Sequence, residues 1–250
     1  RVVRFAELLH RVHEIPDLMR LRFVTSYPGD FTDDILEAMR DLPRLCEYLH
    51  IPAQSGSNTV LQRMKRQYTA EEYFELMERA RTIVPDISLA GDFIVGFSGE
   101  TEEDFEKTVE MVKRVRYKNI FVFKYSVRPG TAADRSLADD IPNGVKRQRN
   151  TRLLEVQQRI SLEENKKLVG REVEVLVEGY SKAAIKAQEA EQARGQEISW
   201  RRTDQLIGRT PGDQIVVFAG TQASIGRLVK IRIAAATALT LHGDMVEKTT

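Results

Sequence analysis

The chain has 250 residues, of which 42% are hydrophobic and 30% are charged. This balance supports a buried core and excludes an intrinsically disordered protein. The formal net charge of +1 neither requires nor excludes a nucleic-acid partner. The single cysteine, Cys46, excludes an internal disulfide and a metal site built from several cysteines of this chain. No apolar run is long enough to span a bilayer and no signal-peptide pattern is present, so we expect a cytoplasmic protein.

The first half of the sequence alternates strand-like with helix-like segments. It begins at Arg1, without an initiator methionine, directly in a helical pattern, so we expect a piece of a longer protein. Short apolar segments bounded by Gly, Pro or polar residues are typical of strands, and segments of helical period follow them. The alternation predicts parallel strands joined by right-handed crossovers. The predicted strands are 21–26, 48–52, 87–95 and 119–125.

Three helix starts in this half carry capping signals. Thr32 precedes two aspartates, whose charge suits the positive end of a helix dipole. Thr69 is followed by Glu72 at the spacing of a capping box. Thr101 likewise precedes a first turn rich in acidic residues. These signals place helices directly after the loops that follow the predicted strands.

The second half changes character near residues 141–144, where Ile-Pro-Asn-Gly ends the alternation. A single helical pattern rich in lysine and arginine follows, from 145 to 169. Residues 181–197 are rich in Ala, Gln, Glu and Lys and predict an inserted exposed loop or short helix. Beyond Gly170, alternating apolar residues predict a small antiparallel barrel or sandwich. Its predicted strands are 171–177, 215–218 and 228–233.

The loops after the predicted strands hold the residues best suited to chemistry, because such loops converge at the carboxyl ends of parallel strands. Gly96 and Gly99 lie between the third predicted strand and the helix that follows it. Such glycines let the backbone approach a flat ligand, and the free N–H groups of a helix start bind polar atoms. The same glycines also fit an ordinary turn, since short glycine motifs are weak signals.

Polar and aromatic side chains follow two of the other predicted strands. Gln54 and Ser55 offer hydrogen bonds to a ribose or an amino-acid group, and Arg66 can pair with a carboxylate. All three also fit roles in a turn or on a solvated surface. Aromatic residues that lead to Tyr125 can pack on an adenine or simply in the core. His50, a lone histidine on a strand, favours a structural role.

The segments around Gln54, Gly96 and Tyr125, in this order and spacing, resemble the radical-SAM tRNA methylthiotransferase family. The resemblance covers nearly the whole chain. Ser98 stands where the family usually has proline, and Thr25-Ser26-Tyr27-Pro28 looks like a variant of the family's Ser-Pro-His-Pro segment. The absence of a Gln-His pair after Pro52 resembles the MiaB-like branch, which modifies tRNA, more than the branch that modifies a ribosomal protein. The most specific matches are Leu-His-Ile-Pro-Ala-Gln-Ser-Gly-Ser at 49–57, Ile-Val-Gly-Phe at 94–97, Gly-Glu-Thr-Glu-Glu-Asp-Phe at 99–105, Tyr-Ser at 125–126 and Arg-Pro-Gly-Thr at 128–131.

The resemblance implies an α/β fold, in which an incomplete (β/α) radical-SAM-type barrel is followed by a small all-β TRAM-like barrel that binds RNA. The implied domains are the partial barrel at 1–143, a basic linker helix at 144–169 and the TRAM-like barrel at 170–248. In that family, S-adenosylmethionine binds across the carboxyl ends of the strands. Carried over by motif position, its binding residues are Ser26, Gln54, Ser55, Arg66, Gly96, Glu100 and Tyr125.

Basic residues support an RNA partner, because lysine and arginine beside an aromatic side chain suit phosphates and stacked bases. A helix with mixed lysine and glutamate is equally explained as a solvated surface, and we prefer that interpretation for the middle of the long helix. The predicted RNA-binding residues are Trp200, Arg201, Arg202, Arg209, Lys146 and Arg149.

Radical-SAM chemistry requires a 4Fe-4S cluster held by three cysteine thiolates, and the family carries a second cluster that supplies the sulfur. This chain has only Cys46, which we expect to be a buried structural thiol. The resemblance therefore implies that the parent protein holds two 4Fe-4S clusters and that this chain holds none. We expect no metal site and no catalytic residue in the chain alone.

The resemblance implies a parent enzyme that adds a methylthio group to C2 of N6-isopentenyladenosine at adenosine 37, next to the anticodon of tRNA. The partner is then the anticodon stem-loop, the sulfur arrives through a missing N-terminal domain, and the protein is a monomer without membrane contact. Three other interpretations stay open. They are action on N6-threonylcarbamoyladenosine, RNA binding without catalysis, and a different barrel enzyme such as an aldolase with Lys124 as its reactive amine.

Overall fold

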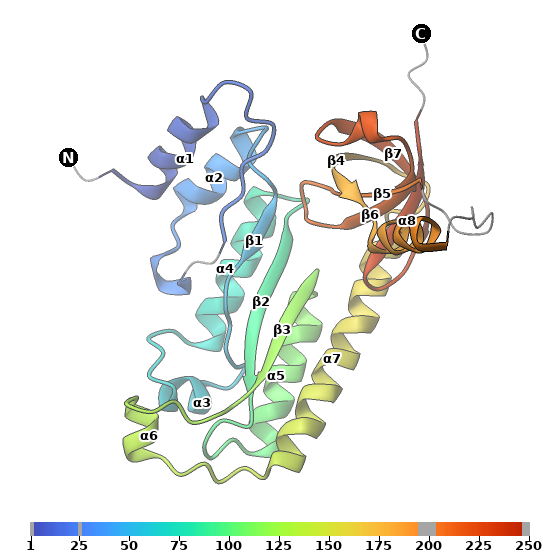
Figure 1. The fold of residues 1–250 in the computed structure, drawn as a ribbon. Helices are drawn as coiled ribbons and strands as arrows, with labels where there is room; N and C mark the ends of the chain where they lie inside the picture. Colours follow the sequence, from blue (N-terminus) through green and yellow to red (C-terminus); the bar gives the residue numbers. More distant parts are fainter. Residues whose placement is uncertain (1–2, 25–26, 195–203, 247–250) are drawn as a thin grey trace. The chain divides into compact units, whose positions relative to one another are not determined.

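The computed structural model describes residues 3–24, 27–194 and 204–246. The chain divides into two compact units, Arg1–Ser161 and Leu162–Thr250, each with its own hydrophobic core (Figure 1). The division falls inside the long helix α7 (Asn143–Lys166), which begins one residue before the predicted linker helix. Within the ranges described, no helix is both long and apolar enough to cross a membrane.

The first unit is built on a three-stranded parallel sheet in the order β1-β2-β3, with strands β1 (Tyr48–His50), β2 (Ser88–Val95) and β3 (Asn119–Lys124). These strands confirm three of the four predicted ones. The predicted strand at 21–26 is wrong over its described part, because Leu21 forms only an isolated bridge with Leu45 and Val24 is exposed to solvent. Leu21 and Phe23 pack against the core but are only partly buried, so the run does not form a core strand.

Helices cover one face of this sheet and connect its strands, as the alternating pattern predicts (Figure 1). The predicted capping box of Thr69 and Glu72 begins α4, and Thr101 forms a second one with Asp104 at the start of α5. These boxes satisfy backbone N–H groups that have no partner inside the helix. The helices of this unit are α1 (Phe5–His13), α2 (Asp33–Asp41), α3 (Asn58–Arg63), α4 (Ala70–Ile83), α5 (Glu102–Val115), α6 (Ala132–Ser136) and the first part of α7.

Alternation along the strands gives the sheet two different faces. Leu49 and Phe93 are fully buried in the core formed with the helices. The pairing register places Asp92 opposite Phe121, and it places Phe123 two residues further along the same face. These three side chains therefore lie on the face away from the helices, which carries the polar and exposed aromatic residues.

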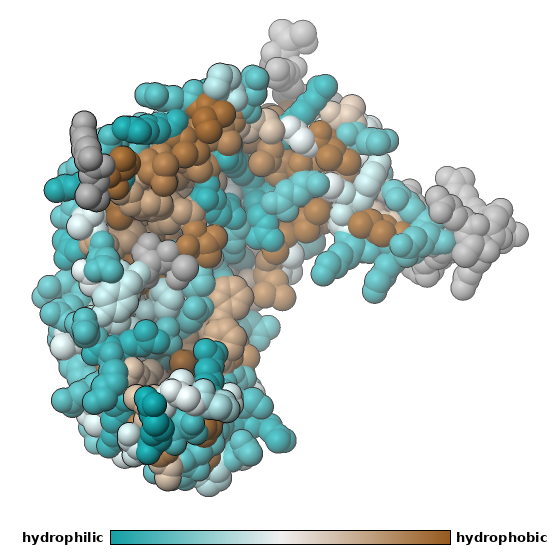
Figure 2. Space-filling view, turned by 60° about the vertical axis from the view of Figure 1, so that its left-hand side comes forward, coloured by the Kyte–Doolittle hydropathy of each residue, from teal (hydrophilic) through white to brown (hydrophobic). Residues whose placement is uncertain are grey.

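A hydrophobic area lies over α1 in the view of Figure 2. Val3, Phe5 and Leu8 are exposed apolar side chains there, whereas Ala6 and Leu9 are buried. This helix therefore packs on the unit through one apolar stripe and keeps other apolar residues on its outer side.

The second unit is a closed barrel of five strands in the order β4-β5-β6-β8-β7. Paired strands are antiparallel except β6 and β8, which run parallel. Fully buried residues such as Val175, Leu206 and Ile231 fill its centre. The predicted small β-barrel is thus confirmed. Its strands are β4 (Glu172–Tyr180), β5 (Gln205–Arg209), β6 (Ile215–Ala219), β7 (Leu228–Ala236) and β8 (Thr240–Met245).

The sequence patterns do not predict β5 and β8, because each strand contains a glycine that is more typical of a turn or bulge. A Cβ atom on Gly208 would lie 2.4 Å from the carbonyl oxygen of Leu176, and one on Gly243 would lie 2.3 Å from that of Arg232. Only glycine fits such a close approach of neighbouring strands. These glycines therefore belong inside the barrel wall and not between its strands.

Helix α8 (Lys182–Arg194) occupies most of the segment predicted to be an exposed loop or short helix. The hydroxyl oxygen of Ser181 accepts a hydrogen bond from the backbone N–H of Ala184 at 3.1 Å and so caps the helix start. Ala184 and Ala187 are buried, and the helix contacts β5. The segment is therefore a helix packed on the barrel.

Candidate active site at the carboxyl ends of the parallel strands

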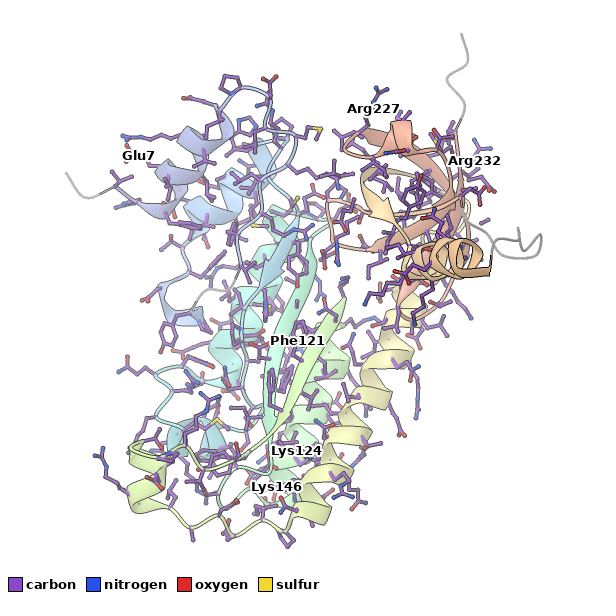
Figure 3. The ribbon with its side chains drawn as sticks, in the orientation of Figure 1. Glu7, Phe121, Lys124, Lys146, Arg227 and Arg232 are labelled. Carbon is purple, nitrogen blue, oxygen red and sulfur yellow. The ribbon has the colours of Figure 1, made fainter. Side chains whose placement is uncertain are left out.

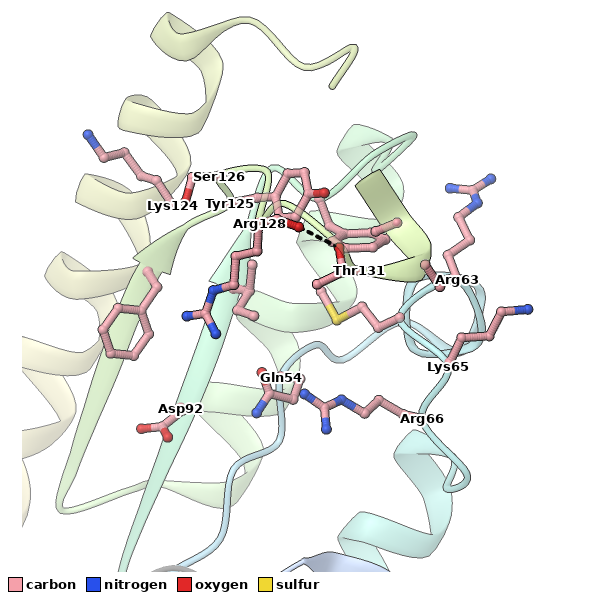
Figure 4. Close-up of a pocket in the computed structure, with 16 residues that line it drawn as sticks. Gln54, Arg63, Lys65, Arg66, Asp92, Lys124, Tyr125, Ser126, Arg128 and Thr131 are labelled. Atoms are coloured by element: carbon pink, nitrogen blue, oxygen red, sulfur yellow. Dashed lines mark hydrogen bonds between the residues drawn. The ribbon is translucent and has the colours of Figure 1, made fainter. Parts of the chain in front are cut away.

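A cavity of about 570 Å³ lies at the carboxyl ends of the three parallel strands (Figure 4). Gln54 follows β1, Asp92 and Ile94 belong to β2, and Phe123 and Tyr125 lie at the end of β3; all five line the cavity. The volume falls in the range of pockets for small molecules and cofactors. Polar and aromatic side chains converge here because the loops that follow parallel strands meet at one edge of the sheet.

Two guanidinium groups point into this cavity. Figure 4 shows Arg66 and Arg128 directed toward Gln54, from opposite sides. Arg63 and Lys65 also border the cavity but extend away from it in the same view, and Arg63 Nη1 donates to the carbonyl oxygen of Gly99 at 2.5 Å. Arginine pairs with carboxylates in a bidentate fashion, so this part of the cavity suits an anionic group.

Gln54 has a backbone conformation that is rare for a residue other than glycine, with φ at 66°. Hydrogen bonds on both sides hold it there. Its N–H donates to the carbonyl oxygen of Asp92 at 2.8 Å, and its carbonyl oxygen accepts from the N–H of Ile94 at 2.9 Å. Such strain persists only where neighbours over-determine the conformation, and it concentrates at functional sites. Here it holds the Gln54 side chain at the cavity.

The loop between β2 and α5 is held by a buried carboxylate. Gly96 has φ at 72°, and its N–H donates to Oε2 of Glu100 at 2.6 Å. The same oxygen accepts from Nη1 of Arg149 at 2.7 Å. Burial raises the pKa of Glu100, while the Gly96 N–H and the Arg149 charge oppose that rise. A Cβ atom on Gly96 would lie 2.3 Å from Cγ of Lys146, so glycine is needed where the Lys146 stem packs.

The predicted cofactor residues fall into three groups. Gln54, Arg66 and Tyr125 line the cavity. Ser55 is fully buried, with Oγ 3.3 Å from Oγ1 of Thr108 on α5, and it contacts this helix instead of the cavity. Gly96 and Glu100 shape the adjoining loop without lining the cavity, and Ser26 lies outside the described residues.

Most residues of the cavity were not predicted as site residues, among them Asp92, Phe97, Phe123 and Arg128. Asp92 offers the clearest sequence signal, since it is the only charged residue in an otherwise apolar strand. Because side chains alternate along a strand, Asp92 points to one face of the sheet and Phe93 to the other. Aromatic residues such as Phe123 carry no comparable signal, because core strands are rich in them.

His50 and Asp92 form a hydrogen-bonded pair on the face of the sheet away from the helices. Nε2 of His50 lies 2.9 Å from Oδ1 of Asp92, and the imidazole stacks on the ring of Phe121 with centroids 5.8 Å apart. His50 is 9% exposed. Its place agrees with the predicted structural role, and its partners show what it supports: a carboxylate at the cavity and an aromatic ring on β3.

The predicted RNA-binding residues of α7, Lys146 (labelled in Figure 3) and Arg149, have other partners. Lys146 is 1% exposed, donates from Nζ to the carbonyl oxygen of Tyr125 at 3.2 Å and pairs with Asp139. Arg149 is also buried and pairs with Glu100. Buried and neutralised charges cannot contact phosphates, so the structure argues against an RNA role for both residues.

The remaining predicted RNA contacts belong to the second unit. Arg209 pairs with Glu178 at 3.2 Å and with Asp213 at 2.8 Å. Trp200, Arg201 and Arg202 lie outside the described residues.

Cys46 is buried, as predicted for a structural thiol, and Nη2 of Arg22 lies 4.0 Å from its sulfur. In the part of the chain that the structure describes, no group of three His, Cys, Asp or Glu side chains is placed to hold a metal ion.

Comparisons with known proteins agree with this arrangement. A model of the radical SAM superfamily matches residues 3–112, and a model of the TRAM domain matches residues 197–246. The tRNA-2-methylthio-N(6)-dimethylallyladenosine synthase of Rhodopirellula baltica is 50% identical over 95% of this chain and 48% of its own length. The protein of the same name from Moorella thermoacetica is 44% identical over 98% of this chain and 51% of its own length.

Among solved structures, the radical SAM enzyme coproporphyrinogen III oxidase (HemN) from Escherichia coli aligns with a TM-score of 0.45 and 24% identity, over 58% of this chain and 32% of that chain. The chain spans about half the length of the curated relatives it matches. Residues 3–112 thus match the radical SAM superfamily, residues 197–246 match the TRAM domain, and nearly the whole chain is similar to relatives named tRNA-2-methylthio-N(6)-dimethylallyladenosine synthase.

Proposed function

We propose that this chain is the part of a tRNA methylthiotransferase that holds S-adenosylmethionine and the tRNA substrate. The whole enzyme adds a methylthio group to C2 of N6-isopentenyladenosine, the dimethylallyladenosine of the relatives' names, at adenosine 37 next to the anticodon. One observation carries this proposal. The cavity at the strand ends lies in a chain that is 50% identical to a relative named for this reaction.

The residues around the cavity suit S-adenosylmethionine. Gln54 offers an amide to the ribose or the amino-acid group, and Arg66 and Arg128 suit the carboxylate. Phe97 and Tyr125, with ring centroids 4.7 Å apart, offer an aromatic surface to the adenine. In radical-SAM chemistry the cofactor supplies the methyl group and the radical initiator. The residues of this chain bind it and orient it.

The chain does not supply the ligands of an iron–sulfur cluster. A radical-SAM cluster needs three cysteine thiolates, and the only cysteine of this sequence, Cys46, is buried away from the cavity lining. We therefore assign two 4Fe-4S clusters and the delivery of sulfur to other parts of a longer protein. No step of the reaction is derived through them.

The second unit supports tRNA binding, because a TRAM domain matches residues 197–246 and the relatives are named for tRNA modification. We propose the anticodon stem-loop as the bound element, with Trp200, Arg201, Arg202 and Arg209 as candidate contacts. Arginine contacts to phosphate make such binding weaken as salt rises. The proposal places the enzyme in the cytoplasm as a monomer.

The other interpretations are not favoured. The relatives' names specify a dimethylallyl group and an enzyme, which agrees with neither a threonylcarbamoyl substrate nor a purely RNA-binding module. An aldolase would need a lysine directed at its substrate. Lys124 points away from Gln54 and Asp92 in Figure 4.

A chimeric enzyme tests the proposal. This chain replaces the matching half of the Rhodopirellula baltica relative, in cells that lack the native enzyme, and tRNA nucleosides are measured by mass spectrometry. We expect 2-methylthio-N6-isopentenyladenosine with the chimera and its loss with Arg66→Ala. A folded, iron-loaded chimera that leaves N6-isopentenyladenosine unmodified contradicts the proposal, as does one that methylthiolates threonylcarbamoyladenosine instead.

A further inference from the structure

Two phenylalanine side chains are exposed beside the cavity, on the face of the sheet away from the helices. Phe121, which Figure 3 labels on β3, is 48% exposed, and Phe123 on the same strand is 54% exposed. They are two residues apart on β3, so they point to the same face. Phe123 lines the cavity, as does Ile94, which lies opposite it in the pairing register. The exposed aromatic surface is therefore continuous with the site.

A carboxylate is fixed within this aromatic surface. Asp92 lies opposite Phe121 in register and lines the cavity. His50 supports both of them, since its Nε2 lies 2.9 Å from Oδ1 of Asp92 and its ring stacks on Phe121. Because His50 is buried and Asp92 is 26% exposed at its side chain, the pair presents its acceptor oxygens on the cavity side. The result is a hydrogen-bond acceptor beside an apolar aromatic surface.

We propose that Phe121 and Phe123 bind the apolar substituent on N6 of the substrate adenine, and that Asp92 accepts a hydrogen bond from the N6–H group. This inference rests on the proposed function and names the part of the site that reads the modified base. A dimethylallyl group is a branched hydrocarbon, for which exposed aromatic rings are suitable partners. The substituted amine keeps a single hydrogen, which needs one acceptor when it is buried.

The same groups discriminate against the polar alternative. A threonylcarbamoyl substituent carries a carboxylate, which the charge of Asp92 repels when the carboxylate of S-adenosylmethionine already occupies Arg66 and Arg128. It also carries polar atoms that Phe121 and Phe123 leave without hydrogen-bond partners. Unmodified adenine meets neither penalty and lacks only the apolar contact. Specificity thus comes from an attractive surface for one substituent and a repulsive group against the other.

Binding of labelled anticodon stem-loop RNAs, followed by fluorescence anisotropy on the full chain, tests this inference. Three RNAs differ only in one base, which is adenosine, N6-dimethylallyladenosine or N6-threonylcarbamoyladenosine. We expect the dimethylallyl RNA to bind about 10- to 100-fold more tightly than the unmodified one, the range for one apolar group in a pocket. Phe121→Ser with Phe123→Ser should remove this preference, so that the dimethylallyl and unmodified RNAs bind with the same affinity. Asp92→Asn should raise the affinity for threonylcarbamoyl RNA relative to dimethylallyl RNA.

Matched variants separate recognition from folding. Leu154→Ser removes a side chain of α7 that is 44% exposed, and it should keep the preference. Phe123→Leu keeps an apolar surface and should keep most of the preference for dimethylallyl RNA. Circular dichroism melting checks that every variant folds. Equal binding of the three RNAs, or a preference that survives the double substitution, overturns the inference and leaves the proposed function standing. If no RNA binds, the proposed RNA role fails, and NMR titration of the free nucleosides decides the inference by the same criteria.

Discussion

Replacement of Arg149 by methionine should strongly destabilise the first unit, because it leaves the buried carboxylate of Glu100 without its counter-ion. Glu100 is 2% exposed, and its Oε2 lies 2.7 Å from Nη1 of Arg149. Among the described residues, Oε1 has no hydrogen-bond partner, so no other group compensates the charge on that side. Removing one partner of a buried pair costs about 3–5 kcal/mol. The contact of Arg149 with Glu102 adds little, since Glu102 is exposed.

The pH dependence of this loss follows from the pKa of Glu100. Burial raises that pKa above its ordinary value of 4.5, and Arg149 opposes the rise. The folded protein then binds more protons than the unfolded chain, so its stability falls as pH rises from about 4.5 through the folded-state pKa. Arg149→Met removes an opposing charge and raises the pKa further. The penalty should therefore be smallest in acid and largest at neutral pH.

Urea titrations at acidic and neutral pH, followed by near-ultraviolet circular dichroism of the tyrosines, measure this free energy of unfolding. Glu100→Gln is the matched partner variant. In its background the loss of Arg149 no longer leaves a buried charge unpaired, so the second substitution should cost much less than in the wild-type chain. A penalty for Arg149→Met below about 1 kcal/mol, the value of a surface pair, refutes the reasoning. So does a penalty that is the same at both pH values.

Three further substitutions test other parts of the structure. Gly96→Ala should lower the free energy of unfolding by about 1–3 kcal/mol, because its φ of 72° is strained and its Cβ would lie 2.3 Å from a neighbouring carbon. Gly144→Ala, with nothing within 4 Å, is the control, and equal effects in urea titrations contradict the prediction. Arg66→Ala should weaken S-adenosylmethionine binding about tenfold or more in calorimetry, and unchanged affinity removes it from the site. Tyr73→Phe removes the hydroxyl that donates to the carbonyl oxygen of Ile51 at 2.8 Å. It should cost about 1–3 kcal/mol, so an unchanged melting temperature counts against it.

Local periodicity in the sequence predicts those parts of the fold that depend on local periodicity. The strands β2 and β3 and the capping box at Thr69 lie within a residue of their predicted positions. The strands and site residues that the sequence does not predict depend on contacts between distant segments. The interior glycine of β5, Gly208, shows its purpose only when Leu176 is placed beside it. In the same way, the sequence marks Asp92 as a charged residue in a strand, but its place at a cavity is seen only once the sheet shows which of its faces the helices leave uncovered.

The helix α7 shows why basic composition alone does not identify an RNA-binding surface. Lys146 and Arg149 read as candidate RNA contacts, yet both are buried and bind the loops that border the cavity. Lys146 holds the carbonyl oxygen of Tyr125 after β3, and Arg149 holds Glu100 after β2. Two strand ends are therefore tied to α7 through charged groups, and the loss of Arg149 alone would leave the buried charge of Glu100 unpaired. Because Glu100 in turn fixes the Gly96 N–H, Arg149→Met should weaken S-adenosylmethionine binding as well as stability. A variant that loses stability with unchanged affinity for S-adenosylmethionine would show that the helix supports the unit and not the cavity.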